Sequence, residues 1–156
     1  MSVEAESRSR LYLEDFAVGQ IFRSATMRVD TTDIKGFAQQ FDPQPFHLDE
    51  TAAKATLFAG LAASGWHTAA ITMRLLVAGG APIAGGIIGA GVDELRWPRP
   101  TRPGDQLRVE SEVLEVRPSR SRPDQGLLKM RTTTLDQNDE PVQSMVANLL
   151  VPRRTP

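Results

Sequence analysis

The chain has 156 residues, of which 40% are hydrophobic and 24% charged, and its formal net charge is −1 at pH 7. This size is typical of one domain with its own core, and the near-neutral charge provides no overall field to attract nucleic acid or an acidic membrane. The absence of cysteine excludes disulfides, thiolate nucleophiles and Cys-ligated zinc, and two histidines leave little material for a His-based metal site.

No apolar run reaches the length of about 18 residues that a membrane-spanning helix needs, and the start of the chain does not resemble a signal peptide. We therefore expect a soluble protein of the cytoplasm. Residues 1–10 are polar and are predicted to form a flexible tail, and residues 11–152 are predicted to form a single domain.

The first third of the domain is predicted to contain one strand and two short helices. Imperfect alternation of apolar residues indicates a strand over 21–29, and a helical stripe indicates a helix over 32–41, capped by Thr31 or Thr32. A second helix is predicted over 49–58, with Asp49 as its cap. One face of the predicted strand is expected to carry Ile21, Ala25, Met27 and Val29, and one stripe of the first helix Ile34, Phe37, Ala38 and Phe41.

Between these helices lies the hexapeptide Asp42-Pro43-Gln44-Pro45-Phe46-His47. Its prolines restrict the backbone and favour extended conformations in the residues before them, so Asp42 and His47 are not expected to share a helix. The segment is predicted to be an ordered bend. A carboxylate and an imidazole at a fixed separation form a minimal acid–base pair near neutral pH; the alternative is that both residues only cap the flanking helices.

The longest helical pattern starts at Ser64-Gly65 and ends at Gly79-Gly80. Apolar residues occupy most of its faces, which is typical of a helix buried in the middle of a domain. Its main apolar face carries Trp66, Ala69, Ala70, Met73, Leu76 and Val77, with Ile71 and Leu75 opposite. Residues 79–91 contain six glycines without the spacing of a nucleotide-binding loop, and these are expected to let a sheet approach the helix closely.

The last third of the chain is predicted to form four consecutive strands, over 92–97, 107–113, 127–135 and 142–151. Asn138-Asp139 is predicted to turn between the last two. Residues 117–126 are predicted to form a hairpin loop, whose three arginines could meet a phosphate but are more typical of a solvated loop. The order of elements predicts an α+β fold with an antiparallel sheet wrapped around one helix.

The start of the long helix is a candidate for the second part of the same site. The first N–H groups of a helix lack partners within it, so the Gly65 N–H could receive negative charge developing on a carbonyl oxygen. Ser64 is a good N-cap, and the alternative is a well-capped helix without a further role. Ser64 also lacks the Gly-x-Ser-x-Gly setting of a hydrolase nucleophile, and His67 is interpreted as a neutral structural or pocket-lining residue.

These motifs together resemble the MaoC-like dehydratases, the R-specific enoyl-CoA hydratases. The stretch 41–49 is similar to their hydratase signature, with its core Asp-x-Asn-Pro-x-His, and 63–70 is similar to the start of their central helix. Segment 95–107 resembles the strand and the Gly-Asp turn that follow in the family. The sequence departs from the pattern at Gln44, where Asn is usual, and at Ser64, where many members have His.

The resemblance spans about residues 11–151 and implies a hotdog fold, in which an antiparallel β-sheet wraps around one long central helix. It also implies a homodimer or larger homo-oligomer that joins two sheets, with a site for an acyl-CoA or acyl-carrier thioester near the interface. Asp42 and His47 would be the catalytic pair, and the Gly65 N–H would polarise the thioester carbonyl. The neighbouring residues predicted to contact the substrate are Phe46, Ser64 and Trp66.

The leading functional prediction is reversible addition of water to a 2-enoyl thioester, giving a 3-hydroxyacyl thioester. Coenzyme A enters only as part of the substrate, and the prediction includes no metal and no redox cofactor. Hotdog proteins also include thioesterases, which usually carry a carboxylate on or near the central helix, and the stretch 66–77 contains none. A non-catalytic thioester-binding module is the third alternative, which the Asp42–His47 pair disfavours.

Overall fold

The structure, a computed structural model, describes residues 9–154, so residues 1–8 of the predicted flexible tail lie outside it. The elements of this part of the chain are η1 (Leu13–Asp15), β1 (Ile21–Arg23), β2 (Met27–Arg28), α1 (Thr31–Phe41), α2 (Pro45–Leu48), α3 (Glu50–Lys54), α4 (Gly65–Gly79), β3 (Ile88–Arg96), β4 (Gln106–Pro118), β5 (Gln125–Leu135) and β6 (Pro141–Pro152).

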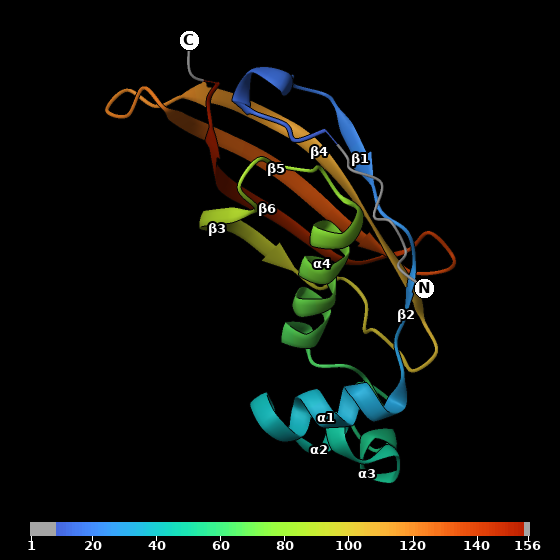
Figure 1. Cartoon of the computed structure of the whole chain (residues 1–156). Helices are drawn as coiled ribbons and strands as arrows, with labels where there is room; N and C mark the ends of the chain where they lie inside the picture. The colour runs from blue at the N-terminus through green and yellow to red at the C-terminus, as the bar shows by residue number, and fades with distance from the viewer. Residues whose placement is uncertain (1–8, 155–156) are drawn as a thin grey trace, which may run out of the picture.

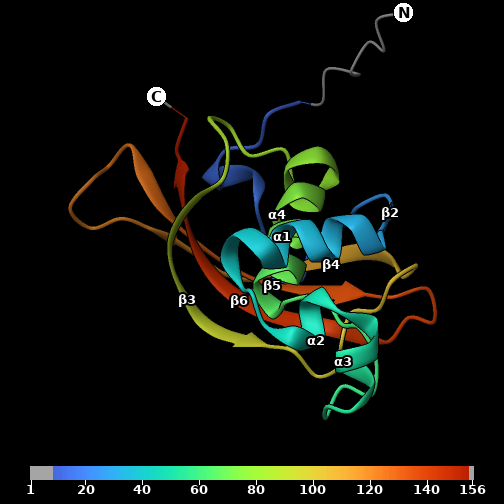
Figure 2. The same ribbon diagram turned by 90° about the horizontal axis from the view of Figure 1, so that it is seen from below.

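The strands form one antiparallel sheet in the order β1-β4-β5-β6-β3, with β2 paired to the start of β4. The sheet curves around α4, while α1, α2 and α3 gather at one end of that helix (Figures 1 and 2). This arrangement confirms the predicted α+β class and the antiparallel sheet wrapped around one long helix. None of the helices within residues 9–154 is long and apolar enough to span a membrane.

Strands β4 and β5 alternate buried and less buried residues along most of their length, so one face of the sheet is buried. The core lies against this face. One apolar cluster joins α1 and α4 to β4 and includes Ile34, Ile71 and Leu107. A second joins η1 to β5 and β6 and includes Leu13 and Leu128. Burial of each large aliphatic side chain contributes about 1.5–3 kcal/mol, so the two clusters fix the sheet along both halves.

The strand predicted over 21–29 is interrupted. Between β1 and β2, the Ser24 hydroxyl accepts a hydrogen bond from the Val109 N–H at 2.9 Å, so a side chain replaces a backbone carbonyl in the ladder. The break changes which residues face inward. Ile21 and Ala25 are exposed whereas Val29 is buried, so the prediction that these residues share one face was wrong.

The two short helices differ from the prediction at their ends. The N-cap of α1 is Asp30, without a side-chain capping bond, so the prediction of Thr31 or Thr32 was wrong. Asp49 caps α3 as predicted, by accepting a hydrogen bond from a backbone N–H of the first turn. That helix ends at Lys54, before the predicted limit of 58, because the chain then turns toward a left-handed residue, Ala59, at φ 54°.

The long helix α4 is confirmed, but its buried face is not the predicted one. Trp66, Met73 and Val77 are exposed. The residues that α4 buries are His67, Thr68, Ile71, Thr72 and Leu75. Thr68 and Thr72 can be buried because hydroxyl partners lie opposite them, Thr101 in the connection between β3 and β4 and Thr134 on β5, so their hydrogen bonds are satisfied.

The glycine-rich segment does not act as predicted. Strand β3 starts at Ile88, inside this segment, and a methyl group added at Gly89 or Gly91 would meet nothing within 4 Å. Close approach of sheet to helix therefore does not explain these glycines. Gly85 and Gly86 instead have φ of 78° and 96°, a left-handed backbone that permits the turn into β3.

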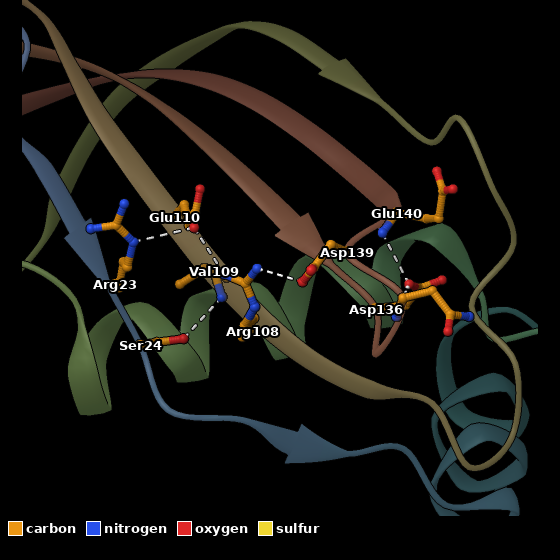
Figure 3. A network of polar contacts seen from close by, with 9 residues as sticks. Arg23, Ser24, Arg108, Val109, Glu110, Asp136, Asp139 and Glu140 are labelled. Atoms are coloured by element: carbon orange, nitrogen blue, oxygen red, sulfur yellow. Dashed lines mark hydrogen bonds and ion pairs between the residues drawn. The ribbon is translucent and has the colours of Figure 1, made fainter.

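The predicted turn between the last two strands is confirmed. The Asp136 carboxylate accepts hydrogen bonds from the N–H groups of Asn138 and Glu140, at 2.8 and 3.1 Å, and Asp139 takes φ 60°. Asp139 also accepts a hydrogen bond from Arg108 of β4 at 2.7 Å. Arg108 also bonds Glu110 of β4, which pairs with Arg23 of β1 (Figure 3). These contacts connect the turn to the β1 edge of the sheet.

Candidate active site

The predicted acid–base pair comes together. Asp42 follows α1 and caps it, donating its N–H to the Ala38 carbonyl at 2.8 Å, and His47 lies in α2. The bend predicted between them contains this additional single-turn helix, which Pro45 can start because the first turn needs no N–H donor there. The Asp42 Oδ2 and His47 Nε2 atoms are 3.3 Å apart.

The buried His47 ring is held by its other nitrogen. Nδ1 lies 2.6 Å from the carbonyl oxygen of Ala62. A carbonyl oxygen can only accept, so Nδ1 carries a hydrogen and donates it. In the neutral ring Nε2 then presents a lone pair toward Asp42, which is the form a general base requires.

Both oxygens of the Asp42 carboxylate are bonded. Oδ2 accepts a hydrogen bond from the Ser64 hydroxyl at 2.7 Å, and Oδ1 accepts one from the Gln44 side chain. Burial is the largest single effect and raises the pKa of Asp42, but the Ser64 and Gln44 hydrogen bonds, with the nearby His47, together hold that pKa below its ordinary value. The carboxylate is therefore ionised at neutral pH.

The start of α4 faces the same region. Ser64 is the N-cap, and its hydroxyl oxygen accepts a hydrogen bond from the Trp66 N–H at 3.3 Å while donating to Asp42. Among residues 9–154, no acceptor is bonded to the Gly65 N–H. This donor, at the positive end of a 15-residue helix, is available to an oxygen of a ligand.

A cavity of about 320 Å³ contains both the imidazole and the start of α4. Its walls come from α2, the loop before α4, α4 itself and the segment after β3. The lining residues are His47, Phe58, Ala63, Gly65, Thr68, Trp97, Pro98, Arg99, Pro100 and Thr101. A ligand oxygen at the Gly65 N–H and a proton acceptor at His47 can thus serve one molecule in one cavity.

The residues predicted to contact substrate lie around this cavity in different ways. Phe46 packs edge-on against His47, with ring centroids 4.6 Å apart, and so supports the imidazole from outside. Ser64 is fully buried and its hydroxyl is committed to Asp42. Trp66 is 60% exposed and meets Trp97 edge-on, with centroids 5.3 Å apart. None of the three lines the cavity.

Phe58, Trp97 and Thr101 line the cavity although the sequence did not predict them as site residues. Segment 95–107 carried a resemblance to the family, which was the available signal, but nothing in its spacing assigned a contact to any side chain. Phe58 is positioned from that segment. The Arg102 guanidinium donates to the backbone carbonyls of Phe58, Gly60 and Leu61, and so fixes the loop before α4.

His67 does not face the cavity. Its ring stacks on Phe37 of α1, with centroids 4.8 Å apart and planes 9° from parallel, and its Nδ1 is without a hydrogen-bond partner among the described residues. Burial lowers the pKa of His67, against a smaller opposite effect of Asp33. The ring is therefore neutral and acts as a packing group. Within residues 9–154, no group of three or more His, Asp or Glu side chains is placed to hold a metal ion.

The chain is similar to proteins whose names include dehydratase and hydratase. Residues 15–134 match the family model described as MaoC like domain. The structure resembles the MaoC-like dehydratase from Rhodospirillum rubrum, with a TM-score of 0.91 and 60% identity over 94% of this chain and 99% of that one. It also resembles R-hydratase PhaJ1 from Pseudomonas aeruginosa, with a TM-score of 0.73 and 29% identity over 93% of this chain and 88% of that one. An uncharacterized protein of Bacillus subtilis (strain 168), YdeM, is 33% identical over 90% of this chain and 99% of its own length.

Proposed function

The chain belongs to the MaoC-like domain family, and we propose that it is a hydro-lyase that reversibly adds water to a 2-enoyl thioester. The observation that carries this proposal is the Asp42–His47 pair, 3.3 Å apart, whose imidazole lines the same cavity as Gly65, while Asp42 lies behind it. The solved relatives whose names include dehydratase and R-hydratase support the same reaction class.

In the proposed reaction, a water molecule binds beside the pair and donates hydrogen bonds to the Asp42 carboxylate and to the Nε2 lone pair of His47. The pair takes one proton from the water as its oxygen bonds to C3 of the enoyl group. The C2–C3 double bond becomes a single bond, and its electron pair moves onto C2 and the thioester carbonyl. The pair then returns the proton to C2, so one water is consumed and the protein is unchanged.

The thioester carbonyl is proposed to accept a hydrogen bond from the Gly65 N–H. The enolate-like oxygen that forms during addition carries more negative charge than the carbonyl of the substrate, so this donor binds the transition state more strongly than the ground state. The N-terminal end of α4 adds its positive partial charge at the same point. Ser64 is proposed to orient Asp42, because its hydroxyl is bonded to that carboxylate.

The substrate is proposed to be an acyl-CoA or acyl-carrier thioester, with coenzyme A present only as part of the substrate, and the setting is proposed to be the cytoplasm. We also propose a homodimer. Strand β3 forms an edge of the sheet and exposes Ile88 and Val92, and α4 exposes Met73 and Val77. An exposed strand edge beside an apolar helix face favours a second copy of the chain as its cover.

The thioesterase alternative lacks a supporting contact. A serine nucleophile needs a base at its hydroxyl, but Ser64 donates to Asp42, and His47 points its free nitrogen at the same carboxylate instead. Residues 66–77 of α4 also contain no Asp or Glu. The helix therefore offers no carboxylate to activate water for hydrolysis.

One assay separates the proposed reaction from its alternatives. The protein is incubated with crotonyl-CoA while the ultraviolet absorbance of the enoyl thioester and the free thiol are followed together. A hydratase removes the absorbance without releasing thiol. Release of thiol would identify a thioesterase, and no change in either signal, with binding detected by calorimetry, would identify a non-catalytic module.

A further inference from the structure

A second cavity lies next to the proposed site and is of a different chemical kind. It measures about 310 Å³ and lies between α4, β3 and the inner face of the sheet. Its lining is mostly aliphatic and thioether and includes Met73, Leu76, Val92, Met130, Met145 and Leu149. Such a cavity suits a hydrocarbon chain, so the question is whether a chain bound in the site can enter it.

Trp97 lines the cavity of the proposed site and packs against the start of α4. A methyl group added at Gly65 would lie 2.7 Å from the Trp97 ring, so the indole covers the start of α4 directly. The indole N–H donates to the Gln143 side-chain oxygen at 2.9 Å. Trp97 is thus held against Gly65 by an anchor on β6, and a carbonyl bound at the Gly65 N–H lies beside the indole.

A buried polar layer continues from this anchor across the interior. The Gln143 amide donates to the Thr72 hydroxyl at 3.2 Å, and Thr72 shares a hydrogen bond of 2.6 Å with Thr134. All three side chains are fully buried. Each polar group in the layer has its partner inside the protein, so parting the layer would leave buried groups unsatisfied.

The order of residues along three elements shows that this layer separates the cavities. On α4, Gly65 and Thr68 line the site, whereas Met73 and Leu76, beyond Thr72, line the apolar cavity. On β6, the residues that follow Gln143 at every second position line the apolar cavity: Met145, Ala147 and Leu149. On β5, Thr134 opposes Gln143, and the cavity-lining residues Thr132 and Met130 lie farther along.

We infer that Trp97, anchored by Gln143, is a specificity-determining wall that ends the acyl-binding part of the site, so the substrate class is short-chain enoyl thioesters. This inference rests on the proposed function. A chain whose carbonyl is bound at Gly65 meets the indole before it can reach the apolar cavity. Additional carbons therefore gain no burial and no affinity, although a suitable apolar volume lies directly behind the wall.

The test measures kcat/KM for hydration of 2-enoyl-CoA thioesters with four, six and eight acyl carbons. Trp97→Ala is expected to raise the eight-carbon to four-carbon ratio by about 10-fold or more, since burial of even one methylene can give tenfold discrimination. Trp97→Phe retains an aromatic wall without the N–H and is expected to keep the parental ratio. Circular dichroism and gel filtration establish that each variant is folded.

Met130→Ala is the matched control, because Met130 lines the apolar cavity from β5 and does not line the proposed site. It is expected to leave the chain-length ratio within about threefold of the parent, well below the tenfold change a gained methylene contact gives. A parent that already prefers eight carbons, and loses that preference in Met130→Ala, would show that the cavity belongs to the site and would overturn the inference. An unchanged ratio in folded Trp97→Ala would do the same.

A binding measurement separates this inference from the proposed function. Saturated acyl-CoA thioesters of the same lengths are titrated calorimetrically into the parent and Trp97→Ala. Affinity that rises with chain length only in the variant supports the wall, even if the parent hydrates no substrate and the hydratase proposal fails. Affinity that rises equally in both proteins contradicts the wall, whatever the activity.

Discussion

The Asp42 carboxylate is held in place by residues from three different segments. Ser64 at the start of α4 and Gln44 in the bend each donate to one of its oxygens, and His47 faces it from α2. Gln44 departs from the usual Asn of the family pattern, and its longer side chain still reaches the carboxylate. The bend therefore tolerates this difference while the acid–base geometry is kept.

The acid–base pair gives the first prediction. Asp42→Asn and His47→Ala are each expected to reduce crotonyl-CoA hydration by about 10²–10⁴-fold, which is the usual contribution of a positioned general acid or base. The reduction is measured as kcat/KM on variants with parental circular dichroism. Near-parental turnover in either folded variant would remove that residue from the mechanism. Gln39→Ala, on an exposed position of α1, serves as the control.

Ser64→Ala gives the second prediction. The sequence predicted only the loss of a helix cap, but the structure adds the loss of a hydrogen bond that lowers the Asp42 pKa. A lowered pKa in the folded protein stabilises it above the unfolded pKa, and this stability disappears as the pH falls through the folded value. Ser64→Ala is therefore expected to be less stable at pH 7 by about 0.5–2 kcal/mol, with a smaller difference in acid.

The same substitution should shift the acidic limb of the pH–rate profile upward, because Asp42 then protonates at higher pH. Denaturant unfolding at pH 7 and in acid, together with kcat/KM across pH, measures both effects. A pH–rate profile that coincides with the parent's would show that Ser64 acts only as a cap.

Site residues could be predicted from the sequence only where they lie close together in one short motif. Asp42 and His47 are five positions apart with two prolines between them, so their meeting follows from backbone restriction. The contacts of Trp97 and Gln143 depend on which positions of β3, β6 and α4 lie opposite one another. A register of that kind is set by the whole sheet and has no local signal.

At the scale of elements, helix and strand positions were predictable where the pattern is long. Helix α4 and strands β4, β5 and β6 were located by periodicity, and the structure extends the strands at their ends. Two of the failures, on β1 to β2 and on α4, have a common cause. A side chain that replaces a backbone partner, such as Ser24 bonded to Val109 of β4, and a buried polar pair, such as Thr72 with Thr134, break the apolar pattern that prediction relies on.

The N-terminus of α4 gives the third prediction. Gly65→Pro deletes the donor N–H at a position where proline suits a helix, but its ring would also collide with Trp97, as any side chain there would. The comparison is therefore made in the Trp97→Ala background, between Gly65→Ala and Gly65→Pro. Both add a side chain, and only proline removes the N–H.

The proline variant is expected to hydrate the best substrate of the Trp97→Ala protein about 10²-fold more slowly than the alanine variant, as loss of one oxyanion donor does elsewhere. Equal rates in the two folded proteins would exclude the Gly65 N–H from catalysis. Single-turnover rates are compared, so that product release does not mask the effect.

At the scale of the whole molecule, the free edge of β3 gives the fourth prediction. Ile88→Lys with Val92→Lys places charges on the exposed edge strand and is expected to lower the dimer fraction, because two like-charged edges repel and pair poorly. Light scattering after gel filtration measures the mass. Val18→Lys, an equally exposed apolar residue outside the sheet, is the matched control.

A fall in hydration that follows the loss of dimer would support a site completed near the interface. A monomeric double variant with parental kcat/KM would show instead that each chain carries a complete site. A dimer of unchanged mass would exclude the β3 edge as the contact.

The Arg102 clamp described above joins two loops that are far apart in the sequence. The Arg102 guanidinium donates to backbone carbonyls of the loop before α4. The backbone N–H of Arg102 donates to the Asp105 carboxylate at 2.8 Å, within the connection between β3 and β4. If the loop carrying Phe58 opens, the three hydrogen bonds between the Arg102 guanidinium and the carbonyls of that loop are broken, so the β3–β4 connection loses them too. Amide hydrogen exchange should then show residues 58–61 and 102–105 exchanging together, as one cooperative unit that unfolds locally and takes a wall of the cavity with it.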